Sequence, residues 1–325
     1  MPSNPGNLFK ARTFSTASLF ALTLALPQFT PVAQAQSAAD ATSEVLDDVR
    51  IPGEDGRGNE INQVSGLAWD SDEGVVYAVS DYGHIIHLKI NLANDKIASV
   101  DPVYFGPLQD AVGDQTFTDA EDIVVLNGAN GIKGDSQIAV VFEDGPSAAT
   151  FTPQGKFIAQ IELPAPLKDR NAYDGDNQRL ESIAVTSDHG FLFAPQVPLV
   201  GQDLRIHTVY AADGVTWQFD AQGPKHTSTK AMQTLPDGSL MLLEGVNPGG
   251  LMSLIEGGAR ELHLRQLNIA LCKDGGTCQV QDFSPIDAAP MQDRYEGLTQ
   301  VGDNLFLLAT DENSGSRLIL VRTKP

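Results

Sequence analysis

A sequence motif of two predicted strands, which recurs five times along the chain, constrains the fold more than any other feature. Its first part is a run of alternating apolar residues, and its second part is a strongly apolar run that ends in an acid or an amide. The copies are spaced by 56, 60, 49 and 66 residues, because they begin at Ser65, Glu121, Glu181, Lys230 and Glu296. Helical periodicity is nearly absent, so the sequence predicts an all-β protein.

Two further amphipathic segments follow most copies of the motif. We expect strands at Ile85–Ile90 and Val100–Phe105, Ala149–Thr152 and Phe157–Leu163, Arg205–Tyr210 and Thr216–Phe219, and Leu251–Ile255 and Glu261–Ile269. Four strands in each repeat of roughly 58 residues predict a β-propeller of five four-stranded blades. The interval between Glu244 and Glu296 is long enough for a sixth, irregular blade.

The last copy is followed by one strand only, Arg317–Arg322, whereas Glu44–Ile51 precedes the first copy. We therefore expect the N-terminal and C-terminal strands to share a blade and close the ring. The predicted domains are an N-terminal segment over residues 36–59, which includes the closing strand, and one propeller domain over residues 60–325.

Residues 1–35 have the pattern of a signal peptide. Lys10 and Arg12 precede an apolar run, Leu19–Leu26, and Ala33-Gln34-Ala35 fits a cleavage site. A retained membrane anchor is the alternative, but the run is far shorter than the ~20 apolar residues of a span. We expect an exported protein, periplasmic or secreted, with no membrane span in its mature chain.

The only two cysteines lie in a glycine-rich turn, Cys272-Lys-Asp-Gly-Gly-Thr-Cys278. In an oxidising compartment this spacing predicts a local disulfide that clamps a hairpin loop. A metal site is disfavoured because no set of four ligands surrounds the pair.

The chain is strongly acidic, with 42 Asp and Glu against 21 Lys and Arg and a formal net charge of −21. Binding to nucleic acid or to anionic lipid needs clustered basic residues, so both functions are excluded. The excess of carboxylates favours hard cations such as Ca²⁺, which take oxygen ligands. We expect a monomer.

Acids recur at the ends of the predicted strands. They are Glu121, Glu181 and Glu296 at the start of first strands, and Asp81, Glu143, Glu244 and Asp311 at the end of second strands. Antiparallel neighbours bring these ends to one mouth of the axis, where like charges raise one another's pKa unless a cation or a base intervenes. The mouth is expected to hold Ca²⁺ or to keep one acid protonated as a general acid. A structural role as acceptors of loop N–H groups is the alternative.

Three basic residues lie close to these acids in the sequence. Lys230 takes the position that is Glu in three other copies, and Arg179 and Arg294 each lie two residues before a motif Glu. They are candidates for substrate binding and for neutralising the acids. The Gly-x-Ser-x-Gly, His-Glu-x-x-His and Walker motifs are absent from the sequence.

Several of these motifs together resemble the phytase-like propellers, a family also described as esterase-like activity of phytase. The resemblance covers about residues 60–322 and rests on Val64–Trp69, Tyr77–Asp81, Asp119–Ile123, Glu181–Ala184, Leu235–Glu244, Tyr295–Leu298 and Leu308–Asn313. It implies a β-propeller, typically an exported bacterial protein, that hydrolyses phosphate or carboxyl esters. The chain departs from the family pattern at Gln63 and Gln196, where an acid is usual.

The leading hypothesis is a Ca²⁺-dependent hydrolase of a small-molecule ester or phosphorylated substrate. Its catalytic acids are expected to be Glu181 and Glu296, and its metal ligands Asp81, Glu121, Glu143, Glu244 and Asp311. The alternatives are a non-catalytic propeller that binds a ligand or a protein, and a lactonase-type calcium propeller, whose site would need an asparagine such as Asn177 or Asn313.

Overall fold

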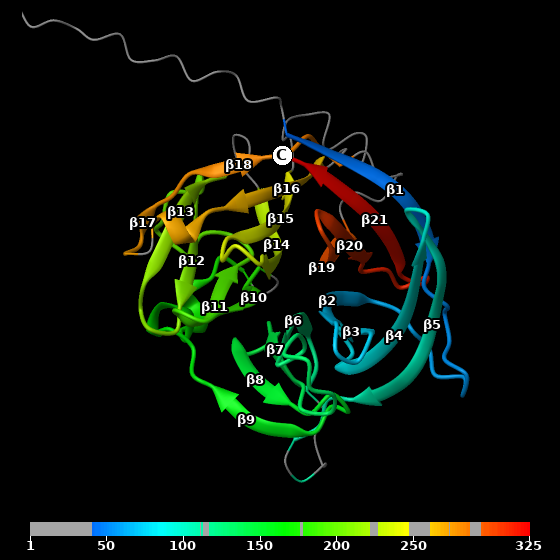
Figure 1. The fold of residues 1–325 in the computed structure, drawn as a ribbon. Helices are drawn as coiled ribbons and strands as arrows, with labels where there is room; N and C mark the ends of the chain where they lie inside the picture. Colours follow the sequence, from blue (N-terminus) through cyan, green and yellow to red (C-terminus); the bar gives the residue numbers. More distant parts are fainter. Residues whose placement is uncertain are drawn as a thin grey trace, which may run out of the picture. The chain divides into compact units, whose positions relative to one another are not determined.

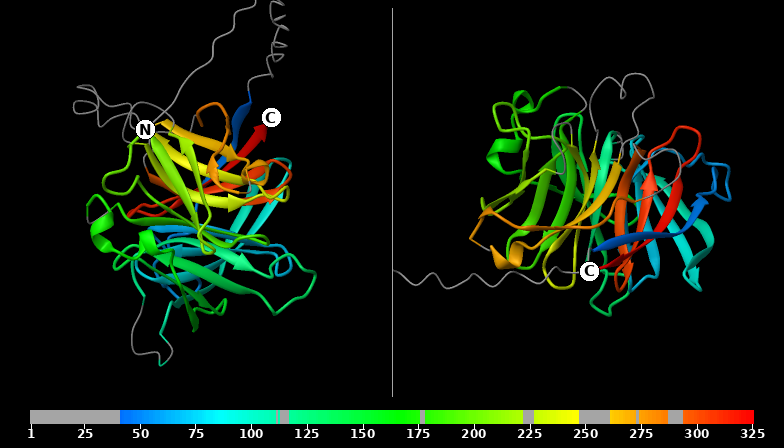
Figure 2. Two further views of the ribbon diagram at one scale, coloured as in Figure 1. Left: turned by 90° about the vertical axis from the view of Figure 1, so that its left-hand side faces the viewer. Right: turned by 90° about the horizontal axis from the view of Figure 1, so that it is seen from above.

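Five β-sheets surround a central axis in the computed structural model, which describes residues 41–110, 112, 117–175, 178–221, 227–246, 261–272, 274–286 and 294–325. Each sheet is one blade, and Figure 2 shows the same ring from two sides. Within these ranges, helix is limited to three single turns, η1 (Ala165–Leu167), η2 (Arg170–Ala172) and η3 (Ile269–Leu271). No helix in the described ranges is long and apolar enough to cross a membrane.

The strands follow one another outward from the axis in each blade. Blade 1 contains β2 (Val64–Asp70), β3 (Val75–Ser80), β4 (His84–Ala93) and β5 (Lys96–Pro107). Blade 2 contains β6 (Ala120–Leu126), β7 (Gln137–Phe142), β8 (Ser147–Phe151) and β9 (Phe157–Ile161). Blade 3 contains β10 (Leu180–Thr186), β11 (Gly190–Pro195), β12 (Ile206–Ala211), β13 (Thr216–Asp220) and the two-residue β17 (Gly276–Thr277).

Blade 4 contains β14 (Thr227–Thr234), β15 (Leu240–Val246), β16 (Glu261–Leu267) and β18 (Val280–Asp282). Blade 5 contains β19 (Tyr295–Gly302), β20 (Leu305–Thr310), β21 (Arg317–Lys324) and β1 (Thr42–Arg50). The described residues thus form the five blades predicted from the repeat.

The ring closes in the predicted way. β1 pairs with β21 in antiparallel register, from Thr42 opposite Lys324 to Arg50 opposite Arg317. The innermost strands β2, β6, β10, β14 and β19 contact one another in that order, and β19 contacts β2. Figure 1 shows these strands around the axis, with β1 and β21 side by side.

Blade 4 departs from the prediction in the order of its strands. Glu261–Ile269 was expected to be the fourth strand, but the observed strand Glu261–Leu267 pairs with β15 and is therefore the third. The fourth strand is Val280–Asp282, which pairs with β16. The expected strand Leu251–Ile255 lies outside the described residues.

The apolar core is divided among the spaces between neighbouring blades. In the described part of the chain, five clusters of buried side chains lie between adjacent pairs of blades; one, for example, joins Leu67 of blade 1 to Leu307 of blade 5. The second strands are covered on both faces and are apolar almost throughout, as in Gln137–Phe142. Outer strands such as Thr216–Asp220 alternate between buried and exposed residues, since only one face is covered.

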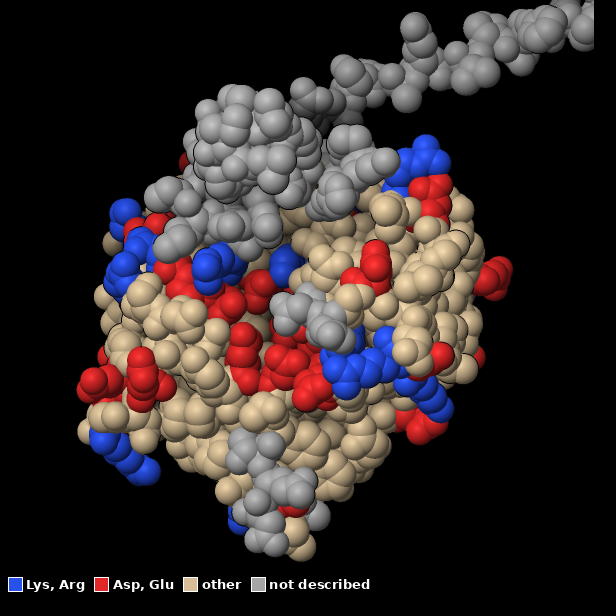
Figure 3. All heavy atoms as spheres, turned by 180° about the vertical axis from the view of Figure 1, so that it is seen from behind, with Lys and Arg blue, Asp and Glu red and all other residues tan. Residues whose placement is uncertain are grey.

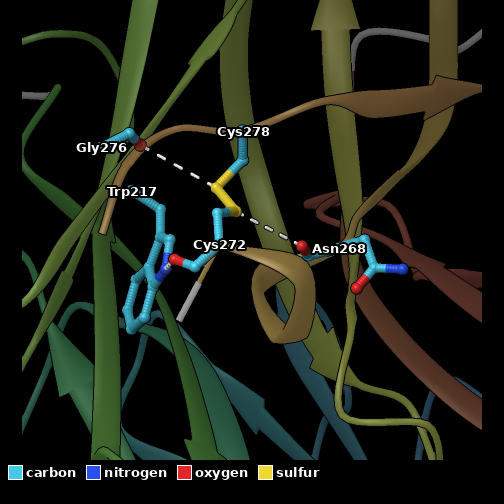
Figure 4. The surroundings of a disulfide bond; sticks show 5 residues. All are labelled: Trp217, Asn268, Cys272, Gly276 and Cys278. Atoms are coloured by element: carbon cyan, nitrogen blue, oxygen red, sulfur yellow. Dashed lines mark hydrogen bonds between the residues drawn. A yellow bond between two sulfur atoms is a disulfide. The ribbon is translucent and has the colours of Figure 1, made fainter. Parts of the chain in front are cut away.

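The predicted disulfide joins Cys272 and Cys278, and Figure 4 shows its surroundings. The loop that it closes lies between two strands of blade 4, but its Gly276–Thr277 segment pairs with β13 of blade 3. The indole Nε1–H of Trp217 donates a hydrogen bond to the Cys272 carbonyl at 2.8 Å. The disulfide therefore constrains a loop that connects two blades, and not only a hairpin.

Replacing both cysteines, Cys272→Ser with Cys278→Ser, is expected to lower the free energy of unfolding by about 2 kcal/mol, the value for a closed loop of this length. Chemical denaturation of the oxidised protein and of the variant measures this difference. A dithiothreitol-treated wild-type protein is the matched control and should behave like the variant; equal stability of all three would contradict a constraining role.

Candidate functional site

A β-bulge opens the innermost strand of every blade. The pairing with the second strand skips one residue in each case, and the skipped residues are Ser65, Glu121, Glu181, Lys230 and Glu296. A bulge leaves its extra residue out of the ladder and redirects that side chain. The residue that begins each copy of the motif is therefore the bulge residue of its strand.

The bulges bring their side chains together at one mouth of the axis. Lys230 Nζ lies 2.6 Å from Glu296 Oε1 and 2.9 Å from Glu181 Oε1, although the three residues belong to three different blades. Gln196 Nε2 also donates to Glu181 Oε1, at 2.9 Å, and the Ser65 hydroxyl donates to Asp81. Figure 3 shows the acidic side chains around a hollow at this end, with basic residues beside them.

A repeated backbone hydrogen bond positions the acids that end the second strands. The N–H groups of Asp81, Glu143, Gln196 and Asp311 each donate to the carbonyl of the residue two places before the bulge of the same blade, at 2.7–3.2 Å. These four residues are therefore structurally equivalent. In the third blade the equivalent residue is an amide, Gln196, as the sequence indicated.

Three carboxylates at the mouth form a group with the geometry of a cation site. Asp119, Glu121 and Glu143 each offer one oxygen, and these oxygens lie within 4.8 Å of one another. Only 9% of the Glu121 surface is exposed, yet its carboxylate accepts no hydrogen bond from any described residue. Asp119 has a φ of +64°, an unusual backbone conformation for a residue other than glycine.

Burial and mutual repulsion raise the pKa values of the acids at the mouth. Burial, with repulsion from Asp311, raises the pKa of Asp81 to about 8. Burial raises the pKa of Glu181 to about 7 even though Lys230 opposes the shift, and burial with the charge of Glu296 raises the pKa of Asp311 to about 6. Burial, then Glu181 and Glu296, raise the pKa of Glu121 well above its usual range. The mouth therefore retains protons near neutral pH.

Lys230 is the counter-charge of this group. Burial alone would lower the pKa of Lys230, but the charges of Glu181 and Glu296 outweigh burial and raise it above its ordinary value. The ammonium group is therefore charged at neutral pH.

Two cavities lie beside the acids. One, of about 250 Å³, is lined by Lys230, Gln178, Gln196 and Ser228 among other residues. The other, of about 270 Å³, is lined by Asp81, Asp119 and Asp144 and by two arginines, Arg170 and Arg179. The backbone N–H of Arg179 donates to Glu143 Oε1 at 2.6 Å, which connects this arginine to the carboxylate group.

Asp122 lies inside the ring of inner strands, below the acidic mouth. Its fully buried carboxylate accepts hydrogen bonds from the N–H groups of Ile183 in blade 3, at 3.0 Å, and Met232 in blade 4, at 3.5 Å. Around it the inner strands are so close that a Cβ at Gly66 would lie 2.8 Å from the Cα of Asp122. Burial raises the pKa of Asp122 well above its usual range.

One predicted metal ligand, Glu244, lies apart from this group. Glu244 is one position earlier in its strand than the equivalent acids of the other blades, because it pairs directly with Thr229. Its fully buried carboxylate accepts a hydrogen bond from Arg265 Nη1 at 2.8 Å. Arg294 is exposed but lies near the mouth, because its backbone carbonyl accepts the Asp311 N–H and its charge opposes the rise in the pKa of Asp311.

The two asparagines considered for a lactonase-type site are not among the described residues of this group. Asn177 lies outside the described residues, and Asn313 is exposed in a turn. Sequence reasoning also missed Asp119, Asp122 and Asp144. Asp119 occupies the place of Arg179 and Arg294, two residues before a motif Glu, and this spacing could have revealed it.

The fold and the site define a five-bladed β-propeller with a buried acidic group at one mouth of its axis. Its sequence agrees with one family model over residues 59–314. The chain belongs to that family, phytase-like, described as esterase-like activity of phytase.

Comparison with individual proteins adds the following. No curated protein matches the chain. Among solved structures it is similar to the Dos1 propeller, with 9% identity, 83% of this chain and 72% of that chain covered, and a TM-score of 0.35. It is also similar to a structural genomics protein of unknown function from Bacteroides thetaiotaomicron, with 12% identity, 87% and 76% of the two chains covered, and a TM-score of 0.44.

Proposed function

We propose that the protein is a Ca²⁺-dependent hydrolase of phosphate or other esters and that the acidic mouth is its active site. The observation that carries the proposal is Glu121, a carboxylate buried to nine-tenths and without a hydrogen-bond donor in the described structure. One of its oxygens lies within 4.8 Å of an oxygen of Asp119 and of Glu143. A carboxylate buried to this degree is charged only when it has a partner, so a bound cation would stabilise its charged form.

The three residues suit calcium. Ca²⁺ binds oxygen ligands at about 2.3–2.6 Å, so its ligands lie up to about 5 Å from one another. The 4.8 Å limit for the oxygens of Asp119, Glu121 and Glu143 meets this condition. Three carboxylates leave coordination positions for water and for a substrate oxygen.

A bound Ca²⁺ would polarise the ester and make water a better nucleophile. Lys230 donates two of its three N–H groups to Glu181 and Glu296, so the third remains for an anionic substrate in the cavity that Lys230 lines. Glu181, with a pKa of about 7, can exchange a proton with the attacking water or the leaving oxygen near neutral pH.

The double variant Glu181→Gln with Glu296→Gln is expected to abolish turnover, by a factor of about 10² or more. The assay measures hydrolysis of p-nitrophenyl acetate, p-nitrophenyl phosphate and inositol hexakisphosphate with Ca²⁺ and with EDTA. Glu162→Gln, an exposed change beside Lys168, is the matched control and should keep full activity.

Turnover by the folded double variant would exclude the two glutamates as catalytic acids. Ca²⁺ binding by the wild-type protein without hydrolysis of any of these substrates would favour the binding propeller instead. Activity in EDTA equal to that in Ca²⁺ would remove the metal from the mechanism.

We also propose that the protein acts outside the cytoplasm. The disulfide between Cys272 and Cys278 supports this location, since such bonds persist in oxidising compartments.

A further inference from the structure

The opposite end of the axis has a second cavity with different chemistry. All five inner strands begin at the acidic mouth, so their C-terminal ends gather at the other mouth. A cavity of about 390 Å³ lies at this end, which we call the neutral mouth, and all five blades contribute to its lining. None of the lining residues carries a charge, and the polar and aromatic ones include Trp69, Asn127, Asn130, Gln233, Thr299 and Gln300.

This cavity is separate from the proposed active site. Asp122 lies between the two mouths, and its carboxylate binds backbone N–H groups of blades 3 and 4. Glycines at positions 66 and 297 bring the inner strands into close contact at the same level. A ligand at the neutral mouth therefore does not reach the acids, and this inference does not depend on the proposed function.

The walls of the cavity are held in place by contacts behind them. The Gly128 carbonyl accepts the Ser71 N–H at 2.8 Å, and Asp72 Oδ2 accepts the Asn130 N–H at 2.7 Å. On the other side Thr299 Oγ1 accepts a hydrogen bond from the backbone N–H of Trp69 at 2.8 Å. Such preorganisation lowers the entropic cost of binding a ligand.

The cavity keeps polar groups available for a ligand. The half-buried Gln300 amide makes no hydrogen bond to any described residue, and it offers both donors and acceptors. Trp69 packs partly on the blade 1 core and also lines the cavity, where it presents an apolar surface with defined geometry. Amides, hydroxyls and one indole together match a ligand that has many neutral hydroxyl groups and apolar C–H faces.

We propose that the neutral mouth binds an uncharged carbohydrate of one or two sugar units. The cavity volume falls within the range of about 300–1,000 Å³ that is usual for ligand pockets. Amide side chains can pair with sugar hydroxyls, and Trp69 can cover an apolar sugar face. A phosphorylated or carboxylated sugar would find no counter-charge among the lining residues.

Tryptophan fluorescence offers a direct test. The chain has two tryptophans, and Trp217 is fully buried in blade 3, so a ligand at the neutral mouth should change the emission of Trp69. The probes are glucose, galactose, mannose, N-acetylglucosamine and their disaccharides, with glucose 6-phosphate and glucuronate as charged counterparts. Calorimetry with the same sugars gives the affinities.

We expect at least one neutral sugar to bind, and Gln300→Ala and Trp69→Ala to weaken its binding by about tenfold or more, about 1.4 kcal/mol. Gln300→Ala removes no described hydrogen bond and should leave the melting temperature nearly unchanged, so its effect on binding is independent of folding. Glu121→Gln at the other mouth is the matched control and should bind the sugar normally.

Three results would overturn the proposal. They are the absence of binding by every neutral sugar at high millimolar concentration, equal binding of charged sugars, and unchanged affinity in both cavity variants. Loss of ester hydrolysis in Glu121→Gln with intact sugar binding would separate this site from the proposed active site.

Discussion

Lys230→Met is expected to destabilise the protein by about 3–5 kcal/mol at pH 8, the usual cost of removing one partner from a buried ion pair. The substitution preserves the approximate length of the side chain but removes the positive charge that lies 2.6–2.9 Å from Glu181 and Glu296. Equilibrium unfolding in urea measures the change in the free energy of unfolding.

The loss should be smaller at pH 5, because carboxyl groups without their lysine can take up protons instead of remaining charged. Lys324→Met is the matched control: its partner Glu44 is exposed, so the change should cost less than about 1 kcal/mol. An equal loss at both pH values would show that Lys230 stabilises the fold by packing and not by its charge.

Calcium is expected to raise the melting temperature of the wild-type protein. At a free concentration one hundred times the dissociation constant, binding to the native state alone adds about 2.7 kcal/mol, which corresponds to roughly 5–10 °C for a domain of this size. Thermal melts in EDTA and in Ca²⁺ measure the shift. Glu121→Gln with Glu143→Gln should abolish it, whereas Glu162→Gln should preserve it.

The pH dependence of the metal-free protein follows from the same residues. Carboxyl groups of the unfolded chain titrate near pH 4, whereas Asp81 and Glu181 titrate at about 8 and 7 in the native protein. The native state therefore binds more protons, and these groups reduce stability as the pH rises from about 4 to about 8. The calcium-induced shift should be larger at pH 8 than at pH 5, because protons compete with the metal. A shift that is absent at both pH values would exclude the cation site.

The sequence was sufficient to predict the architecture because the propeller is a repeat of local units. The spacing of the motif predicted five blades, and the single strand left over at each end predicted the pairing of β1 with β21. The error in blade 4 has a local cause. The connection after Glu244 is long, so a strand count made along the chain placed the expected strand Glu261–Ile269 fourth in the blade and not third.

The site could be predicted only in part. The convergence of Glu121, Glu181 and Lys230 follows from topology, which sequence patterns can reveal. The displacement of Glu244 depends on a single residue of register, and a one-residue change moves a side chain to the other face of a strand. The role of Asp122 depends on contacts with two other blades, and a polar residue inside an apolar strand does not show which strands it will reach.

The pairing of β1 with β21 also has a kinetic consequence. Residues 42–50 find their partners at residues 317–324, so the contact that completes the ring is among the most distant in the sequence. Such non-local contacts slow folding, because the entropy of closing the chain is lost before the contacts form. Until β1 is in place, the outer edge of β21 is an unpaired strand able to pair with another molecule. Blades 1 to 4 can form from nearby segments, whereas blade 5 needs both ends of the folded region, and we expect its assembly to be the slow, aggregation-sensitive step of folding.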